Sequence, residues 1–261
     1  MKTRIILSLV AAFLLQFTSV SADNYTDGVI KLMENEAISI VNTKMFDQAT
    51  QAPNVNADYV KNQMKADMVE WVAEHCRKTM SEKDFNDMVA FYMDPEVLAA
   101  QKKIVSAAAS SQGQEFAQTL MPQMMTLMQG GTPEKLQMPE CDPELKKALL
   151  RWIDVSGSVD GVKASMGCIK NMVADMVPAN VPEEQKQQMT KMMDGLFSYM
   201  GDNAKEILMM SLVGKVDLKD VQAFSAMENK SFFPAYKKLN ASMASDVSTL
   251  MAKLMAGMKK Q

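Results

Sequence analysis

The apolar residues of this chain recur every three or four positions, and this spacing restricts it to helical folds. Starting at Val60, apolar side chains follow at Met64, Met68, Val72 and Cys76. Such spacing places side chains on one face of an α-helix, whereas a half-buried β-strand alternates every second residue. No alternating run of β-branched residues extends beyond a few positions. The pattern predicts an all-α protein of about ten helices.

The first residues form the three parts of a secretory signal peptide. Lys2 and Arg4 are cationic, residues 5–17 are almost wholly apolar, and a run of small residues ends at Ala22. This order is typical of a signal peptide that is cleaved on export. The apolar run is shorter than the roughly 18–20 residues that a membrane span needs, and no later run reaches that length. We therefore predict cleavage after Ala22, export to the periplasm or the extracellular space, and no membrane span.

The mature chain has the composition of a globular protein. Hydrophobic residues make up 48% of the sequence and charged residues 23%, which is typical of a chain that forms a core. Because cleavage removes two cations and no anion, the formal charge of −3 becomes −5. An acidic balance without a basic stripe disfavours nucleic acid as a partner. The remaining length of about 239 residues suffices for one large or two small domains.

Glycine and proline predict where the first half ends. A helical pattern starts at Pro95 and continues to Gly130 and Gly131, and the next ten residues have the composition of a linker. Pro122 lies inside this helical pattern. We expect it to kink a single long helix, because proline removes one amide donor and crowds the preceding turn.

The segments on the two sides of this linker are similar in sequence. Residues 80–93 align with residues 216–229, sharing a Lys-Asp pair and the apolar rhythm. With a gap of one residue, 97–104 then aligns with 232–239. Because the agreement extends beyond one helix, we predict two similar helical bundles that arose by internal duplication. The predicted organisation is a signal peptide at 1–22, a first helical domain at 23–131, and a linker with a second helical domain at 132–261.

One corner of the first half resembles a known family. The motif FYMDP at 91–95 combines an aromatic pair with a helix-starting proline, which is typical of a corner between two helices. With its flanking helices it resembles the exported bacterial family catalogued as domain of unknown function 2059. The segment LLRWIDVSGS at 149–158 is similar to that family's opening helix, and Val97 stands where the family usually has glycine. The resemblance implies a helical fold and export, and it implies no activity, cofactor or catalytic residue.

The sequence contains few candidate catalytic residues. Its one histidine, His75, lies beside an apolar helix face, and the adjacent Cys76 does not face it because neighbours in a helix point in different directions. The sequence has no phosphate loop, zinc-ligand spacing or nucleophile motif. We expect a non-catalytic protein without a cofactor or metal, and an uncharacterised hydrolase that uses His75 is an alternative.

Three cysteines, Cys76, Cys141 and Cys168, would enter an oxidising compartment on export. Cys76 aligns with an apolar residue of the second half and is expected to be a buried thiol. Cys141 precedes a predicted helix and Cys168 lies in the next one, so antiparallel packing could bring them together. We predict a disulfide between Cys141 and Cys168.

Methionine is unusually frequent, with 27 residues in 261, and it recurs at helical spacing. One such face consists of Met121, Met124, Met125 and Met128. Thioethers fill cores, adapt to varied apolar shapes and bind Cu(I). We predict core packing first, with an adaptable apolar groove and a copper site as alternatives. The sequence thus predicts an exported binding or interaction module whose partner is another envelope protein or an apolar small molecule, and periplasmic Cu(I) handling is an alternative function.

Overall fold

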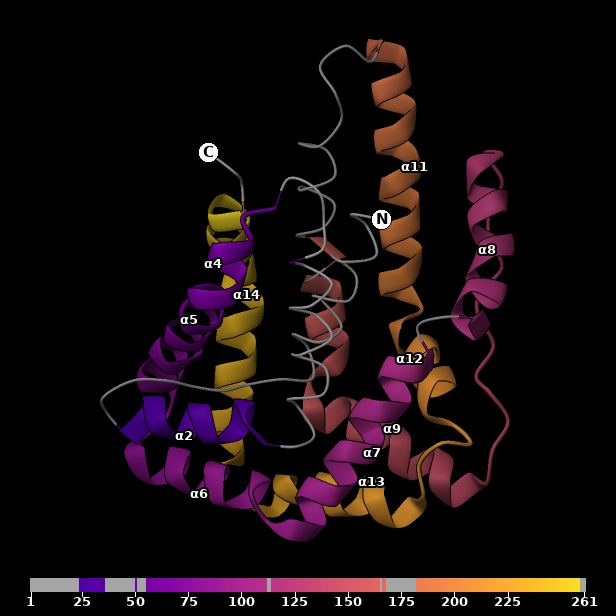
Figure 1. The fold of residues 1–261 in the computed structure, drawn as a ribbon. Coiled ribbons are helices and arrows are strands. Elements are labelled where there is room, and N and C mark those ends of the chain that lie inside the picture. The colour runs from indigo at the N-terminus through magenta and orange to yellow at the C-terminus, as the bar shows by residue number, and fades with distance from the viewer. Residues whose placement is uncertain are drawn as a thin grey trace.

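The computed structural model of the chain describes residues 24–35, 50, 55–111, 114–164, 166–167 and 182–258. Within these ranges the regular structure is helical and contains no strand, which confirms the all-α prediction (Figure 1). The labelled helices are α2 (Asn24–Met33), α4 (Ala57–Asn62), α5 (Met64–Thr79), α6 (Glu82–Tyr92), α7 (Pro95–Ser111), α8 (Gln114–Met128), α9 (Pro143–Ser156), α11 (Glu183–Asp202), α12 (Ala204–Leu212), α13 (Leu218–Ser225), the 3₁₀ turn η1 (Ala226–Asn229) and α14 (Phe233–Met258).

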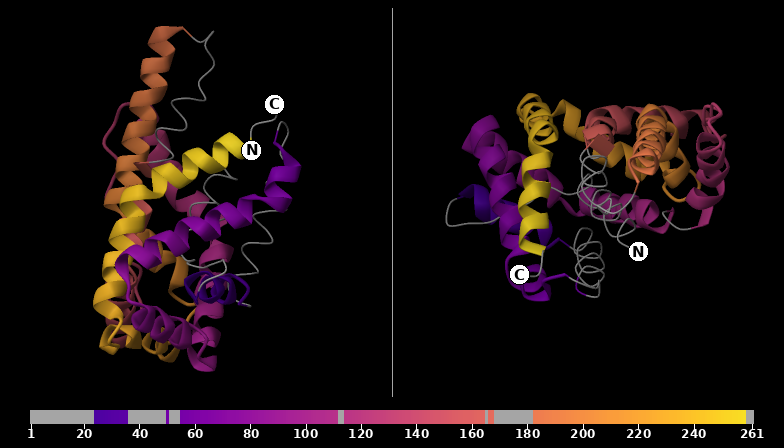
Figure 2. Two further views of the ribbon diagram at one scale, coloured as in Figure 1. Left: turned by 90° about the vertical axis from the view of Figure 1, so that its left-hand side faces the viewer. Right: turned by 90° about the horizontal axis from the view of Figure 1, so that it is seen from above.

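The helices stand in two groups on a common base. In Figure 1, α4, α5 and α14 lie on one side, α8 and α11 rise on the other, and α6 and α13 run across the bottom. Figure 2 shows that α11 extends beyond the other helices. Among the residues that the structure describes, no helix combines the length and the apolar character that a membrane crossing requires.

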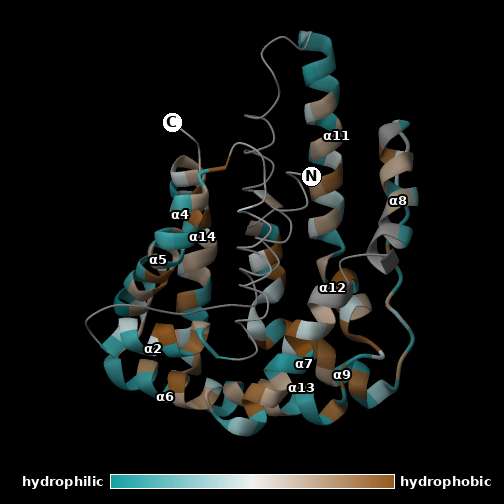
Figure 3. Ribbon diagram, in the orientation of Figure 1, coloured by the Kyte–Doolittle hydropathy of each residue, from teal (hydrophilic) through white to brown (hydrophobic). Residues whose placement is uncertain are grey.

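Buried side chains from both sides of the linker form one continuous core. Phe85 and Met64 from the first half belong to the same cluster as Leu149 and Leu239 from the second, and all four are fully buried. Figure 3 shows hydrophobic residues gathered where α7, α9 and α13 meet. The predicted two bundles therefore share a core, and the division at residue 131 stays a prediction.

The helix ends carry the chemistry of helix caps. Asp142 precedes Pro143, and its Oδ1 accepts hydrogen bonds from the amides of Glu144 and Leu145 at 2.9 and 3.1 Å. At the other end of α9, Gly157 adopts the left-handed conformation, with φ of 69°. A residue with a Cβ is strained in that conformation, so glycine suits this helix end.

The region expected to form one long helix from Pro95 contains two. α7 ends at Ser111 and α8 starts at Gln114, with residues 112–113 outside the described ranges. The prediction of a single helix was wrong, because the local apolar pattern does not distinguish one helix from two that differ in direction. Pro122 lies within α8.

The segment between α8 and α9 has no regular structure, as predicted for a linker, but it is docked. Leu136 is buried, and its amide donates to Asn203 Oδ1 at 2.9 Å. The hydroxyl of Tyr199 donates to the carbonyl of Glu134 at 2.7 Å. The linker is therefore held against α11 and α12.

The motif at 91–95 forms the corner that the sequence predicts, between α6 and α7. The ring centroids of Phe91 and Phe232 lie 5.8 Å apart, and those of Tyr92 and Phe224 lie 5.7 Å apart. Phe224 in turn lies 6.1 Å from Trp152 of α9. These aromatic contacts cross from the first half to the second, so the corner also joins the halves.

Candidate functional site

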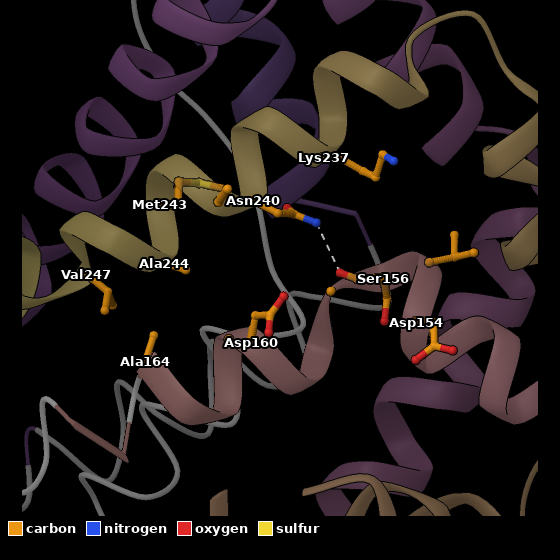
Figure 4. A pocket seen from close by; sticks show the side chains of 13 residues that line it. Asp154, Ser156, Asp160, Ala164, Lys237, Asn240, Met243, Ala244 and Val247 are labelled. Carbon is orange, nitrogen blue, oxygen red and sulfur yellow. Dashed lines mark hydrogen bonds between the residues drawn. The ribbon is translucent and has the colours of Figure 1, made fainter.

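A cavity of about 160 Å³ lies where the end of α9 and residues 158–164 face α14 (Figure 4). The amide nitrogen Nδ2 of Asn240 donates to the carbonyl of Ser156 at 3.1 Å. A Cβ at Gly157 would lie 3.1 Å from the same nitrogen, so glycine permits this close approach. The cavity is smaller than the roughly 300–1,000 Å³ of typical ligand pockets. The polar groups at its edge mainly join the end of α9 to α14 by hydrogen bonding.

His75 belongs to a cluster that joins α5 to α14. Its Nδ1 lies 2.8 Å from the carbonyl of Trp71, and its Nε2 lies 3.4 Å from Oδ2 of Asp246. The indole of Trp71 donates to that same oxygen at 2.9 Å. Hydrogen bonds from Thr249 and then Trp71 lower the pKa of Asp246. His75 is 4% exposed and both ring nitrogens face protein oxygens, so the hydrolase alternative lacks a free base at this position.

Cys76 is a buried thiol, as predicted. Burial raises its pKa to about 12, an effect that the charge of Arg77 only partly opposes. A thiol rather than a thiolate is therefore present near neutral pH, and it is a poor nucleophile. Cys141 is half-buried, and Cys168 lies outside the described residues. The disulfide between these two stays a prediction.

A buried carboxylate, that of Asp67 on α5, is held by three polar side chains. Its carboxylate accepts from the Tyr59 hydroxyl at 2.7 Å and from Gln63 at 3.2 Å. The ammonium of Lys253 on α14 lies 3.1 Å away. Burial alone would raise the pKa of Asp67, but the hydrogen bonds outweigh it and lower the pKa below 3.8.

Replacing Asp67 with asparagine is expected to have an effect that depends on pH. Because the folded-state pKa is lowered, the charged carboxylate stabilises the fold above the unfolded-state pKa, and this stabilisation is lost as pH falls through the folded-state value. At about pH 7 the variant should lose about 1–2 kcal/mol of unfolding free energy. The difference should shrink as the pH falls below about 4. Urea unfolding at a series of pH values measures it.

The matched control is Asp58→Asn, since Asp58 is exposed on α4. It should change the unfolding free energy by only about 0.5 kcal/mol or less at every pH. A loss in Asp67→Asn that is as large in acid as at neutral pH would contradict the assignment.

The methionines divide between core and surface. Met64, Met88, Met209 and Met227 are fully buried, as the core interpretation predicts. Among the described residues, the large hydrophobic side chains that are exposed are all methionines. They are Met93, Met121, Met125 and Met189.

Three of these exposed methionines lie on two helices that pack against each other, α8 and α11. Met121 and Met125 on α8 are 51% and 54% exposed, and Met189 is on α11. Met124 is half-buried, and only the backbone of Met128 is described. Of the four residues predicted to line a groove, the structure thus leaves Met121 and Met125 accessible. Met189 is the third exposed methionine of this helix pair, although it is far away in sequence. We call Met121, Met125 and Met189 the methionine face.

One sequence signal for this surface was missed. No charged residue occurs between Glu115 and Glu134, although α8 is exposed over part of this stretch. A long uncharged run is ordinary in a buried helix but not on a surface. α8 and α11 approach closely at Gly195, where a Cβ would lie 3.3 Å from the side chain of Leu127.

In the described part of the chain, no three His, Cys, Asp or Glu side chains gather in a way that could hold a metal ion. The copper alternative concerns thioethers and stays a prediction. No family model, curated protein or solved structure matches the chain. The resemblance to domain of unknown function 2059 therefore also stays a prediction.

Proposed function

We propose that this protein is an exported, non-catalytic interaction module, and that its methionine face binds apolar side chains of another protein in the cell envelope. The observation that carries the proposal is the exposure of Met121, Met125 and Met189 on two adjacent helices. Large apolar side chains that are exposed together favour association, because burying them removes apolar surface from water.

The chemistry of the face suits a partner of variable shape. Methionine is unbranched and polarizable, so it fits different apolar surfaces at little cost. The uncharged stretch at 116–133 means that a partner can cover α8 without removing a charge from water. The centres of protein interfaces are depleted in charged residues in the same way.

The shape favours a protein over a small molecule. α8 and α11 stand side by side and project from the base (Figure 1). Sites for small molecules are concave and enclose most of the ligand, whereas the outer side of a helix pair suits the apolar face of a helix in another protein. The signal peptide predicted at 1–22 would deliver the module to the compartment of that partner.

The test compares the binding of an environment-sensitive apolar dye by the folded protein and by a variant with Met121, Met125 and Met189 replaced by glutamine. The parent is expected to bind the dye while unfolding cooperatively in urea. The triple variant should lose most of the dye fluorescence. Because these side chains are exposed, its unfolding free energy should change by about 0.5 kcal/mol or less for each substitution.

Met93→Gln is the matched control, since Met93 is exposed outside the α8–α11 pair. It should leave dye binding intact. A parent that binds no dye, or a triple variant that binds as well as the parent, would exclude the proposed surface. Cu(I) titration of the same variants separates the copper alternative, which requires tight binding that only the triple variant loses. Export is tested by the N-terminus of the protein isolated from its own envelope, which should be Asp23 rather than Met1.

A further inference from the structure

The two halves start their helices at equivalent positions. α13 begins 136 residues after α6, Leu218 against Glu82. The same offset relates the N-cap residues, Ser81 and Asp217. In each helix the aspartate at the third position bonds back to its cap, Asp84 to Ser81 and Asp220 to Asp217.

Residues that are related by the same offset of 136 are also buried in both halves. Cys76 and Leu212 are both buried, as are Phe85 and Val221. After the gap of one residue, Ile104 of α7 corresponds to Leu239 of α14, and both are buried. Helix order repeats as well, because α2 packs on α5 and α6 while α9 packs on α12 and α13. α7 and α14 are thus the last helices of the aligned segments, and α8 follows α7 in the first half only.

These last helices pack on the opposite half. Among the labelled helices, α7 makes its most extensive contacts with α13 and also packs on α12. α14 makes its most extensive contacts with α5 and also packs on α4. Figures 1 and 2 show α14 running alongside α5. At its start, α14 also touches its own half around the cavity beside Ser156.

Each last helix also supplies a lysine to a buried aspartate of the other half. Lys103 on α7 lies 2.8 Å from Asp220 on α13. Lys253 on α14 lies 3.1 Å from Asp67 on α5. Both aspartates are buried, and burying a carboxylate is costly unless a cationic or hydrogen-bonding group lies beside it. Each half thus supplies one helix and one cation to the other, although the receiving helices differ: α13 receives Lys103, and α5 receives Lys253.

We infer that the chain is an internal dimer: two related helical units that exchange their last helices, so that each unit completes the core of the other. The recognition surface on each unit is the groove that receives the other unit's last helix, and its occupant is α14 for the first unit and α7 for the second. Neither unit then folds stably without the other, because removing the partner exposes the apolar groove and leaves its last helix unsupported.

The test uses the full chain with a protease site inserted between Gly130 and Gly131, which are both exposed. After cleavage, the two pieces should elute together as a one-to-one complex. Unfolding of the cut protein releases two chains, so its urea midpoint should rise with concentration, by roughly 1 M for a hundredfold increase. The same protein left uncut should show no such dependence.

A substitution tests the exchange itself. Lys253→Met in the cut protein should weaken the association of the pieces by about tenfold, because it removes a charge-assisted contact between them. Lys237→Met is the control, since Lys237 on α14 contacts Phe233 of its own helix, at 5.4 Å from the ring centroid. Pieces that separate and stay folded, a midpoint independent of concentration, or equal effects of the two substitutions would each overturn the inference.

Discussion

Replacing Phe224 with alanine is expected to lower the free energy of unfolding by about 3–5 kcal/mol. Phe224 is buried on α13, and its ring lies between Tyr92 of α6 and Trp152 of α9. Truncation removes buried apolar surface and leaves a cavity that two large rings cannot easily fill. It also breaks the aromatic contact between the two halves. Urea unfolding monitored by circular dichroism measures the loss.

Phe233→Ala provides the control for this prediction. Phe233 is also a phenylalanine in the second half, but it is half-buried at the start of α14 and stacks on Tyr236. Its truncation should cost only about 1 kcal/mol, because part of the ring is already in water. Equal losses in the two variants would show that Phe224 has no special place between the halves.

Replacing Gly28 with alanine is expected to destabilise the protein by about 3 kcal/mol. A Cβ at this position of α2 would lie 2.5 Å from Cε1 and 2.8 Å from Cζ of Phe85. Phe85 is fully buried, so its ring has little room to move, and α2 would have to shift away from α6. Helix propensity alone predicts the opposite sign, a gain of up to about 1 kcal/mol.

Gly167→Ala is the matched substitution, because a Cβ there meets no atom of the described residues within 4 Å. Gly167 is also helical, so the variant should be unchanged or more stable by up to about 1 kcal/mol. The comparison is made by urea unfolding, and hydrogen exchange in α2 shows whether that helix loosens in Gly28→Ala. If both variants gain stability, the close packing of α2 on Phe85 is wrong.

The sequence by itself determined the features that depend on neighbouring residues. Apolar spacing predicted helices, and Asp142 with Pro143 marks the start of α9 through hydrogen bonds that span two or three residues. The corner at 91–95 was predicted for the same reason, since aromatic side chains beside proline act within one turn. Cys76 was predicted to be buried because it aligns with an apolar residue of the second half, and it is fully buried.

Tertiary structure alone decided which distant residues meet. His75 and Asp246 are adjacent only because α14 packs on α5, and the exposed methionines of α8 and α11 lie on neighbouring helices only because α11 packs on α8. All the methionine-rich helices have the same helical spacing. The spacing therefore did not distinguish methionines that are buried in the core from methionines that are exposed to water. The sequence also did not predict that α7 and α14 each pack on the opposite half. An amphipathic helix carries a pattern that requires burial, but the pattern does not specify which of several apolar grooves will bury it.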